Sequence, residues 1–375
     1  MYKSLKLAIG PRVRKSPYYE SSLKYGGEVF TIYNHMYLPI GFEGAIPDYN
    51  KLLDGVQLWD VGCERQIEIT GQDAEKLAQF VTPRDVSKCS PGQAMYTPLI
   101  DFNGGILNDP VMLRLDDNHF WFSLADGDSI LWVEGIAAGY NFDVQIQEPD
   151  VSPLQIQGPN STELMSRVFG NWIKDLGFYT FKRQSFKGIP MVIARMGYSR
   201  ERCYEIFLCD HKKGNELWEI LWKEGQDLKV SAGTPNQILR LEAGILSYLG
   251  DMDRSNNLYE VGLDWIVDLE QSNDFIGKTA MQKIKSDGVK KKLMGGEISG
   301  KEMKFFNEEH WPVLIDNHQV GHLTTAAYSP RLDKNICYIM MDIDHAIIGN
   351  TVSIKSSKEQ LEATLVELPW FKKRV

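Results

Sequence analysis

A tight turn, Phe102-Asn103-Gly104-Gly105, separates two runs of strand-forming residues in the first third of the chain. An asparagine followed by two glycines supplies the left-handed backbone that a short hairpin turn requires. We therefore expect residues 94–101 and 110–114 to be strands, with a further strand at 120–125. Helical patterns precede and follow these strands, at 73–81 and 129–139. This order predicts an antiparallel α+β layer and argues against a doubly wound parallel sheet.

The composition of the remaining chain changes at two places. Residues 148–153 are polar and carry two prolines, which is typical of a crossing between domains. Thr234 and Pro235 predict a helix start, with the threonine as N-cap, for a helix through residues 236–248. From about residue 290, short apolar runs separated by turns predict a small all-β domain. The other predicted elements are helices at 45–55, 161–169 and 215–224, and strands at 56–59, 65–70, 153–157, 190–195, 203–208, 311–315, 337–342 and 351–354.

Composition excludes several classes of protein. No apolar run approaches the roughly 18 residues of a membrane-spanning helix, and the N-terminus lacks the core of a signal peptide. The formal net charge of −9 argues against nucleic acid as a partner. The five cysteines and seven histidines are scattered without metal-ligand spacing. We therefore expect a cytoplasmic protein with no metal site and no membrane or nucleic-acid partner.

Four residues could carry chemistry, although hydrolase, Walker A and Rossmann motifs are absent. Asp109 follows the Gly-Gly turn, where it is either an ordinary turn residue or a carboxylate at the mouth of a pocket. Trp121 shares a strand face with Ser123, so it either belongs to the core or forms an aromatic wall for a flat ring or a cation. Glu205 and Arg240 lie within apolar elements, where charges need partners. Arg240 could pair with Glu205 or with a ligand carboxylate.

An ordered set of motifs along the chain resembles the aminomethyltransferase (glycine-cleavage T-protein) family. The motifs that carry the resemblance are Trp59-Asp60-Val61, Gly104-Gly105-Ile106-Leu107-Asn108-Asp109, Gln157-Gly158-Pro159, Gly197-Tyr198 with Tyr204-Glu205-Ile206-Phe207, Arg240-Leu241-Glu242-Ala243-Gly244, Phe275-Ile276-Gly277-Lys278 and Ser329-Pro330. The resemblance implies an α+β fold of three domains in a cloverleaf around a central folate channel, with antiparallel sheets and an all-β, jelly-roll-like C-terminal domain. The expected domains are 1–55 with 150–240, 56–149 with 241–288, and 289–375.

Within that family, other segments are similar to the dimethylsulfoniopropionate demethylases. They include Tyr33-Asn34-His35-Met36, Glu64-Arg65-Gln66, Asn108-Asp109-Pro110 and Ala125-Asp126-Gly127-Asp128. This similarity implies methyl transfer from a small sulfonium, dimethylsulfoniopropionate, to tetrahydrofolate without a metal. It implies Asp109 as the catalytic carboxylate. The implied folate-binding residues are Trp121, Ser123, Tyr198, Glu205 and Arg240, and the implied substrate-binding residues are Tyr33, Met36, Tyr96 and Trp121.

Two departures from the family pattern and two other functions stay open. Arg200 and Arg202 replace small or acidic residues of one loop, and the C-terminus after Leu368 is short. A conventional aminomethyltransferase of the glycine cleavage system would act on a lipoyl-bound aminomethyl group. A non-catalytic folate-binding protein of the same fold would carry a reactive cysteine in its loop, whereas residues 273–278 have none. The sequence leaves open whether the chain forms a homodimer.

Overall fold

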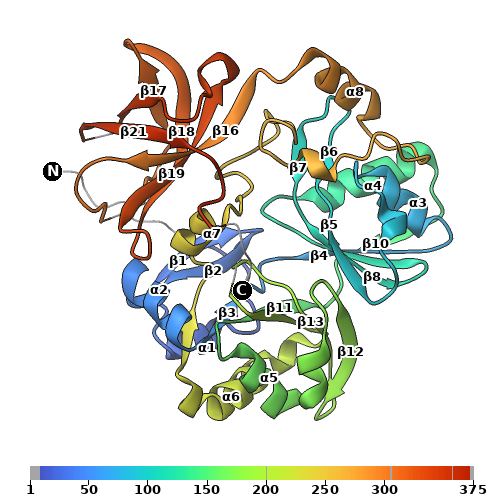
Figure 1. Cartoon of the computed structure of the whole chain (residues 1–375). Helices are drawn as coiled ribbons and strands as arrows, with labels where there is room; N and C mark the ends of the chain where they lie inside the picture. The colour runs from blue at the N-terminus through green and yellow to red at the C-terminus, as the bar shows by residue number, and fades with distance from the viewer. Residues whose placement is uncertain (1–8, 200, 305, 357, 372–375) are drawn as a thin grey trace.

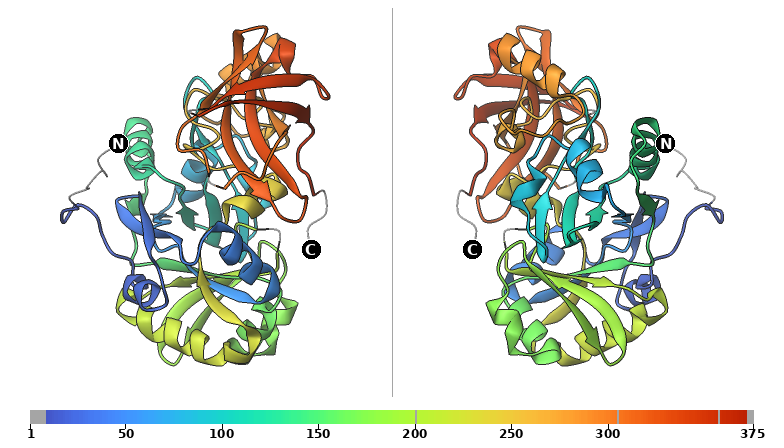
Figure 2. Two further views of the ribbon diagram at one scale, coloured as in Figure 1. Left: turned by 90° about the vertical axis from the view of Figure 1, so that its left-hand side faces the viewer. Right: turned by 90° about the vertical axis from the view of Figure 1, so that its right-hand side faces the viewer.

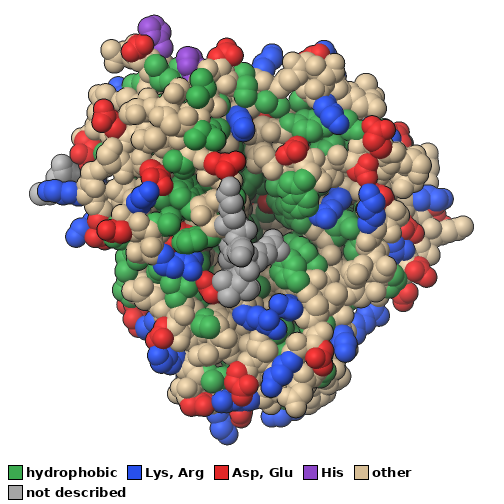
Figure 3. All heavy atoms as spheres, viewed as in Figure 1, with side chains coloured by type: hydrophobic (Ala, Val, Ile, Leu, Met, Phe, Trp, Pro, Cys, Tyr) green, Lys and Arg blue, Asp and Glu red, His purple; other side chains and the backbone are tan. Residues whose placement is uncertain are grey.

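A computed structural model describes residues 9–199, 201–304, 306–356 and 358–371. Figures 1 and 2 show three lobes around a common centre, one of them the barrel of the C-terminal part of the chain. Figure 3 shows the surface hollowed near this centre, with hydrophobic side chains at its border. In the part of the chain that the structure describes, every helix is too short or too polar to cross a lipid bilayer.

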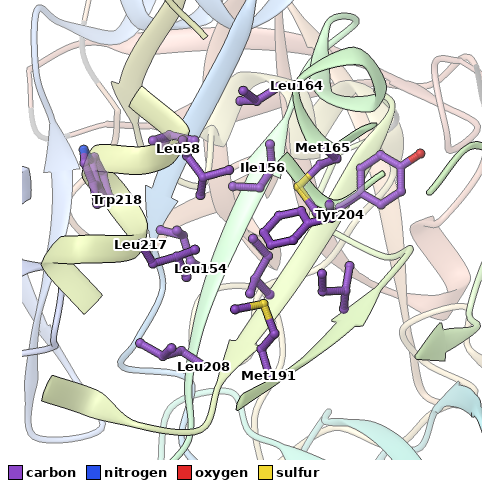
Figure 4. Close-up of a cluster of buried hydrophobic side chains, with 14 of the residues drawn as sticks. Leu58, Leu154, Ile156, Leu164, Met165, Met191, Tyr204, Leu208, Leu217 and Trp218 are labelled. Atoms are coloured by element: carbon purple, nitrogen blue, oxygen red, sulfur yellow. The ribbon is translucent and has the colours of Figure 1, made fainter. Parts of the chain in front are cut away.

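The first lobe contains a six-stranded sheet in which all neighbours are antiparallel except the last pair. Helices cover one of its faces, and Leu154, Ile156, Tyr204 and Trp218 belong to the core between them (Figure 4). The strand order is β12 (Phe181–Phe186), β13 (Ile189–Ala194), β14 (Cys203–Leu208), β11 (Ser152–Gln157), β3 (Val56–Asp60) and β15 (Val230–Gly233). The helices are α5 (Ser161–Phe169) and α6 (Gly214–Glu224).

The predicted boundary between the first two domains, after residue 55, does not agree with the strand pairing of this sheet. Strand β3 pairs with β11 and β15, so it lies in the first lobe and not with the residues that follow it. All five residues of β3 are buried. The sequence of a strand that is buried on both faces does not show which sheet the strand joins. The N-terminal part of the lobe comprises α1 (Tyr19–Lys24), the hairpin β1 (Val29–Tyr33) and β2 (Met36–Gly41), and α2 (Ala45–Asp54).

The second lobe confirms the predicted antiparallel α+β layer. Its five strands are all antiparallel, in the order β10 (Gln145–Gln147), β4 (Gln66–Thr70), β9 (His119–Ser123), β8 (Val111–Asp116) and β5 (Gln93–Tyr96). The helices α3 (Ala74–Phe80) and α4 (Ser129–Tyr140) pack on one face. The Gly-Gly turn joins two further short strands, β6 (Leu99–Ile100) and β7 (Ile106–Asn108). The predicted strand 94–101 is therefore two strands, which separate at Thr97-Pro98 because proline cannot donate to a ladder.

The C-terminal lobe confirms the predicted all-β domain as a closed six-stranded barrel. Its strands follow the order β16 (Lys291–Ile298), β19 (Lys334–Asp342), β18 (His318–Ser329), β17 (Trp311–Ile315), β20 (Thr351–Lys355) and β21 (Gln360–Val366). Helix α8 (Lys278–Asp287) precedes it. Closure leaves no open sheet edge.

Helix α7 (Gln237–Ala243) ties the barrel to the other lobes, and its predicted limits were wrong. Asn236, not Thr234, is the N-cap, because its side chain accepts from two backbone N–H groups of the first turn. The Thr234 hydroxyl donates to Pro39 O at 2.6 Å instead. The helix ends at Gly244, whose φ of 71° begins the left-handed turn that stops it. Glu242, inside the helix, accepts from Ser329 Oγ of the barrel at 2.6 Å.

The uncovered faces of the two sheets meet at the centre of the molecule. Trp121 of β9 and Phe207 of β14 lie with ring centroids 6.2 Å apart, within a buried apolar cluster that both sheets supply. Alternation along β14 places Glu205 on the same face as Phe207. Alternation along β9 places Ser123 on the same face as Trp121. The contact between the sheets is therefore apolar at one end and polar at the other, and the polar end contains the candidate site.

Candidate active site

Asp109 lies between β7 and β8, half-buried. The Tyr96 hydroxyl donates to its Oδ2 at 2.9 Å. Burial raises the pKa of Asp109 to about 7; the Tyr96 hydrogen bond partly opposes this, and the charge of Asp251 adds to it. Its neighbour Asn108 is buried and donates to the backbone oxygens of Ala125 and Asp126, each at 3.2 Å, which fixes the strand end. A carboxyl poised near neutrality can accept a proton from a bound reactant.

Glu205 is 1% exposed on the inner face of β14. Gln155 Nε2 donates to its Oε2 at 3.4 Å, and no described residue donates to its Oε1. Burial raises the pKa of Glu205 well above its usual range, and the charge of Glu64 adds to the shift. On the facing sheet, Gln66 Nε2 donates to Ser123 Oγ at 3.1 Å, while Gln66 Oε1 has no donor among the described residues. Two buried acceptors from opposite sheets therefore lack donors, which is costly unless a ligand supplies them.

Arg240 does not pair with Glu205, so that half of the sequence interpretation was wrong. Its Nη1 donates to Asp251 Oδ2 at 2.5 Å, and both side chains are buried. Nη2 donates to Thr325 Oγ1 of the barrel at 3.0 Å. Burial raises the pKa of the Tyr198 phenol, and the nearby charge of Arg240 partly opposes this shift. The guanidinium therefore holds α7 against the barrel.

The hairpin β1–β2 brings Tyr33 to the site. Asn34 and His35 form its turn with φ of 49° and 59°. The Asn34 side chain donates to Cys63 O and Ala125 O, each at 3.0 Å, and accepts from Gly127 N at 2.7 Å. Burial raises the pKa of Tyr33 well above its usual range, and the charges of Glu64 and Asp109 add to it. The turn therefore fixes Tyr33 beside these carboxyls.

The structure brings together some of the predicted site residues and separates others. Tyr33, Tyr96, Asp109 and Tyr198 are close enough for their charges to act on one another. Met36 is buried in a small cluster with Leu38 and Cys63, with Tyr33 packed against it. Trp121 lies in the apolar contact between the sheets, and its indole N–H donates to Glu68 Oε1 at 2.8 Å. Its polar atom is therefore already used within the fold.

Glu64 is a site residue that the sequence reasoning missed. It follows β3 and precedes β4, is half-buried, and has its pKa raised to about 8 by burial and then by Asp109. No local pattern in the sequence marks it, because it lies in the turn before β4 and its neighbour Asp109 comes from another strand. Gln155 was missed as well, since its role appears only when β11 pairs with β14.

The two arginines that depart from the family's loop sequence, and the short C-terminus, can be compared with the structure. Arg202 Nε donates to Thr162 Oγ1 at 2.9 Å, which ties it to helix α5. Arg200 lies outside the described residues. Near the C-terminus, Trp370 stacks on Tyr338 with centroids 6.2 Å apart, and Phe371 N donates to Glu242 O. The described part of the chain contains no group of three or more His, Cys, Asp or Glu side chains that could hold a metal ion.

Comparison with known proteins gives consistent results. The model of the GCVT N-terminal domain matches residues 18–271, and that of the glycine cleavage T-protein C-terminal barrel domain matches residues 291–372. A dimethylsulfoniopropionate demethylase of Ruegeria pomeroyi is 39% identical over 96% of this chain and 98% of its own. An aminomethyltransferase of a Thermoanaerobacter species is 28% identical over the same shares. The crystal structure of aminomethyltransferase T from Bartonella henselae superposes with a TM-score of 0.85 at 20% identity, covering 96% of this chain and 99% of that one.

Proposed function

Because the chain belongs to the aminomethyltransferase (glycine-cleavage T-protein) family, we propose that it is an enzyme that transfers a methyl group from dimethylsulfoniopropionate to tetrahydrofolate. The products are 5-methyltetrahydrofolate and methylmercaptopropionate. Near full-length similarity to a dimethylsulfoniopropionate demethylase supports this reaction over aminomethyl transfer, since the aminomethyltransferases are less similar.

The observation that carries the proposal is the pair of unsatisfied acceptors, Glu205 Oε1 and Gln66 Oε1. A pterin presents an amino group and ring N–H groups along one edge, and such donors match carboxylate and amide oxygens. The site between the sheets therefore fits the tetrahydrofolate ring. Tyr198, Arg240, Trp121 and Ser123 are proposed as further residues of this site, with Trp121 and Arg240 acting through their packing because their polar atoms have partners within the fold.

The reaction requires that the enzyme align the methyl donor with the folate and transfer one proton. The bond from methyl carbon to sulfur breaks and takes its electron pair to sulfur, which leaves as a neutral thioether. The methyl carbon forms a bond to N5 of the folate, and N5 loses its proton. We assign that proton to Asp109, whose pKa of about 7 suits an acceptor at neutral pH. Tyr33, Met36, Tyr96 and Trp121 are the proposed contacts of the sulfonium, where aromatic faces attract a cation by about 0.5–2 kcal/mol each.

The test uses the purified chain with tetrahydrofolate and dimethylsulfoniopropionate labelled in its methyl groups. Label should appear in 5-methyltetrahydrofolate, and methylmercaptopropionate should form in equal amount. The matched reaction without tetrahydrofolate should release no thioether. Turnover of a lipoyl-bound aminomethyl group with none of the sulfonium would instead identify an aminomethyltransferase. Stabilisation of the fold by tetrahydrofolate with neither reaction would indicate a folate-binding protein without catalysis.

A further inference from the structure

Glu64 and Asp109 lie at the same edge of the second sheet, just before β4 and β8 begin. Gln66 of β4 pairs with Ser123 of β9, and Ser123 pairs with Val111 of β8. Two residues beyond each of these positions lie Glu64, Ala125 and Asp109, just past the paired ends of the three neighbouring strands. Leu124 N donates to Arg65 O at 2.9 Å, so the alignment continues past the last paired residue. The carboxyls of Glu64 and Asp109 therefore border the same space.

The Glu64 carboxyl takes no part in the hydrogen bonds and ion pairs among the described residues. Its backbone N donates to Val61 O at 2.8 Å, whereas no described residue donates a hydrogen bond to its side chain. The charge of Asp109 acts on Glu64, that of Glu64 acts on Glu205, and that of Asp251 acts on Asp109. Among the described residues, no lysine or arginine forms an ion pair with any of these three carboxyls. Crowded carboxyls without a counter-ion retain their protons, as the raised pKa values of Glu64, Asp109 and Glu205 show, and a bound molecule that brings a positive charge favours their ionised forms.

The reaction places the substrate's charge at this position. The transferred methyl must lie against the folate nitrogen that Asp109 serves, and the sulfonium sulfur is one bond from that methyl. The positive charge therefore lies beside Asp109, within reach of its neighbour Glu64. We propose that Glu64 recognises the positive charge of the substrate and selects a sulfonium over a neutral molecule of the same shape. This inference rests on the proposed function.

The same contact accounts for turnover. Once the methyl has moved, the sulfur is neutral and its attraction to the Glu64 carboxylate is lost. The thioether product is then held more weakly than the substrate at the position where both must fit. An aromatic wall alone would give a smaller difference in affinity between substrate and product, since the neutral product retains the apolar contact with the ring.

The experiment compares two ligands that differ in charge and little in shape. Dimethylsulfoniopropionate and 4-methylpentanoate share a carboxylate and a branched end, which is a sulfonium in the first and a carbon in the second. Their dissociation constants are measured calorimetrically at pH 9, above the Glu64 pKa of about 8, for the parent, for Glu64→Gln and for Glu163→Gln. Glu163 is half-exposed on helix α5, so its variant matches the change in net charge outside the site.

The parent and Glu163→Gln should prefer the sulfonium, and Glu64→Gln should reduce that preference at least about tenfold by loss of one nearby charge interaction. The circular dichroism spectra and thermal midpoints of all three should be alike, which reports that Glu64→Gln is folded. If Glu64→Gln keeps the parent's preference, the assignment of Glu64 is overturned while the reaction stands. If the parent itself binds no dimethylsulfoniopropionate, the proposed function fails first.

Discussion

Replacing Asp109 by asparagine should stabilise the ligand-free protein while it slows methyl transfer. The side chain keeps its shape and an oxygen that can accept from the Tyr96 hydroxyl, but it no longer carries a charge. Burial raises the pKa of Asp109 from 3.8 to about 7. At about 1.4 kcal/mol for each factor of ten in proton affinity, the ionised carboxylate costs the folded state on the order of 4 kcal/mol.

The direction of the pH dependence follows from that shift. Between about pH 4 and pH 7 the folded protein retains a proton that the unfolded chain has lost, so the parent's stability falls as the pH rises through this window. Above pH 7 the penalty is complete. The variant lacks this penalty, so its advantage in unfolding free energy should widen by about 2–3 kcal/mol between pH 5 and pH 8.

Urea unfolding at these two pH values measures the effect, with the exposed Asp344→Asn as a control that should parallel the parent at both. In the same preparations, methyl transfer by Asp109→Asn should fall by about 10² or more, the usual scale for loss of a general base or an electrostatic group. Equal stability differences at pH 5 and pH 8 would refute the claim that burial penalises this carboxylate. Transfer at the parent rate would show that alignment alone accounts for catalysis.

Asn236→Ala should lower the unfolding free energy by about 1 kcal/mol, because it removes the N-cap of helix α7; an unchanged urea midpoint would contradict that assignment. Asp251→Asn should cost about 3–5 kcal/mol, since it leaves the Arg240 guanidinium buried without its counter-charge, and thermal unfolding at several scan rates measures the loss. Glu205→Gln should weaken tetrahydrofolate binding in calorimetric titration without lowering the stability of the empty protein, whereas lost stability with unchanged affinity would make Glu205 structural. Metal chelators should leave methyl transfer intact, and activity lost in chelator and restored by one metal would overturn this expectation.

Local signals in the chain predicted much of the fold. The helix Ala45–Asp54 stops at Gly55 and the C-terminal part is all β, as predicted. The turn at Gly104-Gly105 joins two antiparallel strands, although the second is β7 and not the predicted strand 110–114. These features depend on residues close together in the chain, whose backbone preferences and spacing are visible in the sequence. Asp109 was predicted between the Gly-Gly turn and a strand, and it does precede β8, with the short strand β7 between it and the turn.

Contacts between distant segments were decided only by the tertiary structure. The sequence indicates that Arg240 and Glu205 are charges that need partners, but it does not show which residues the partners are. Arg240 is bound by Asp251 and by Thr325 of the barrel, because α7 packs on the barrel and not on β14. Glu64 became a candidate only when β4, β9 and β8 paired in one register and aligned it with Asp109. A carboxyl's burial and neighbours depend on that register, and no local pattern in the chain encodes it.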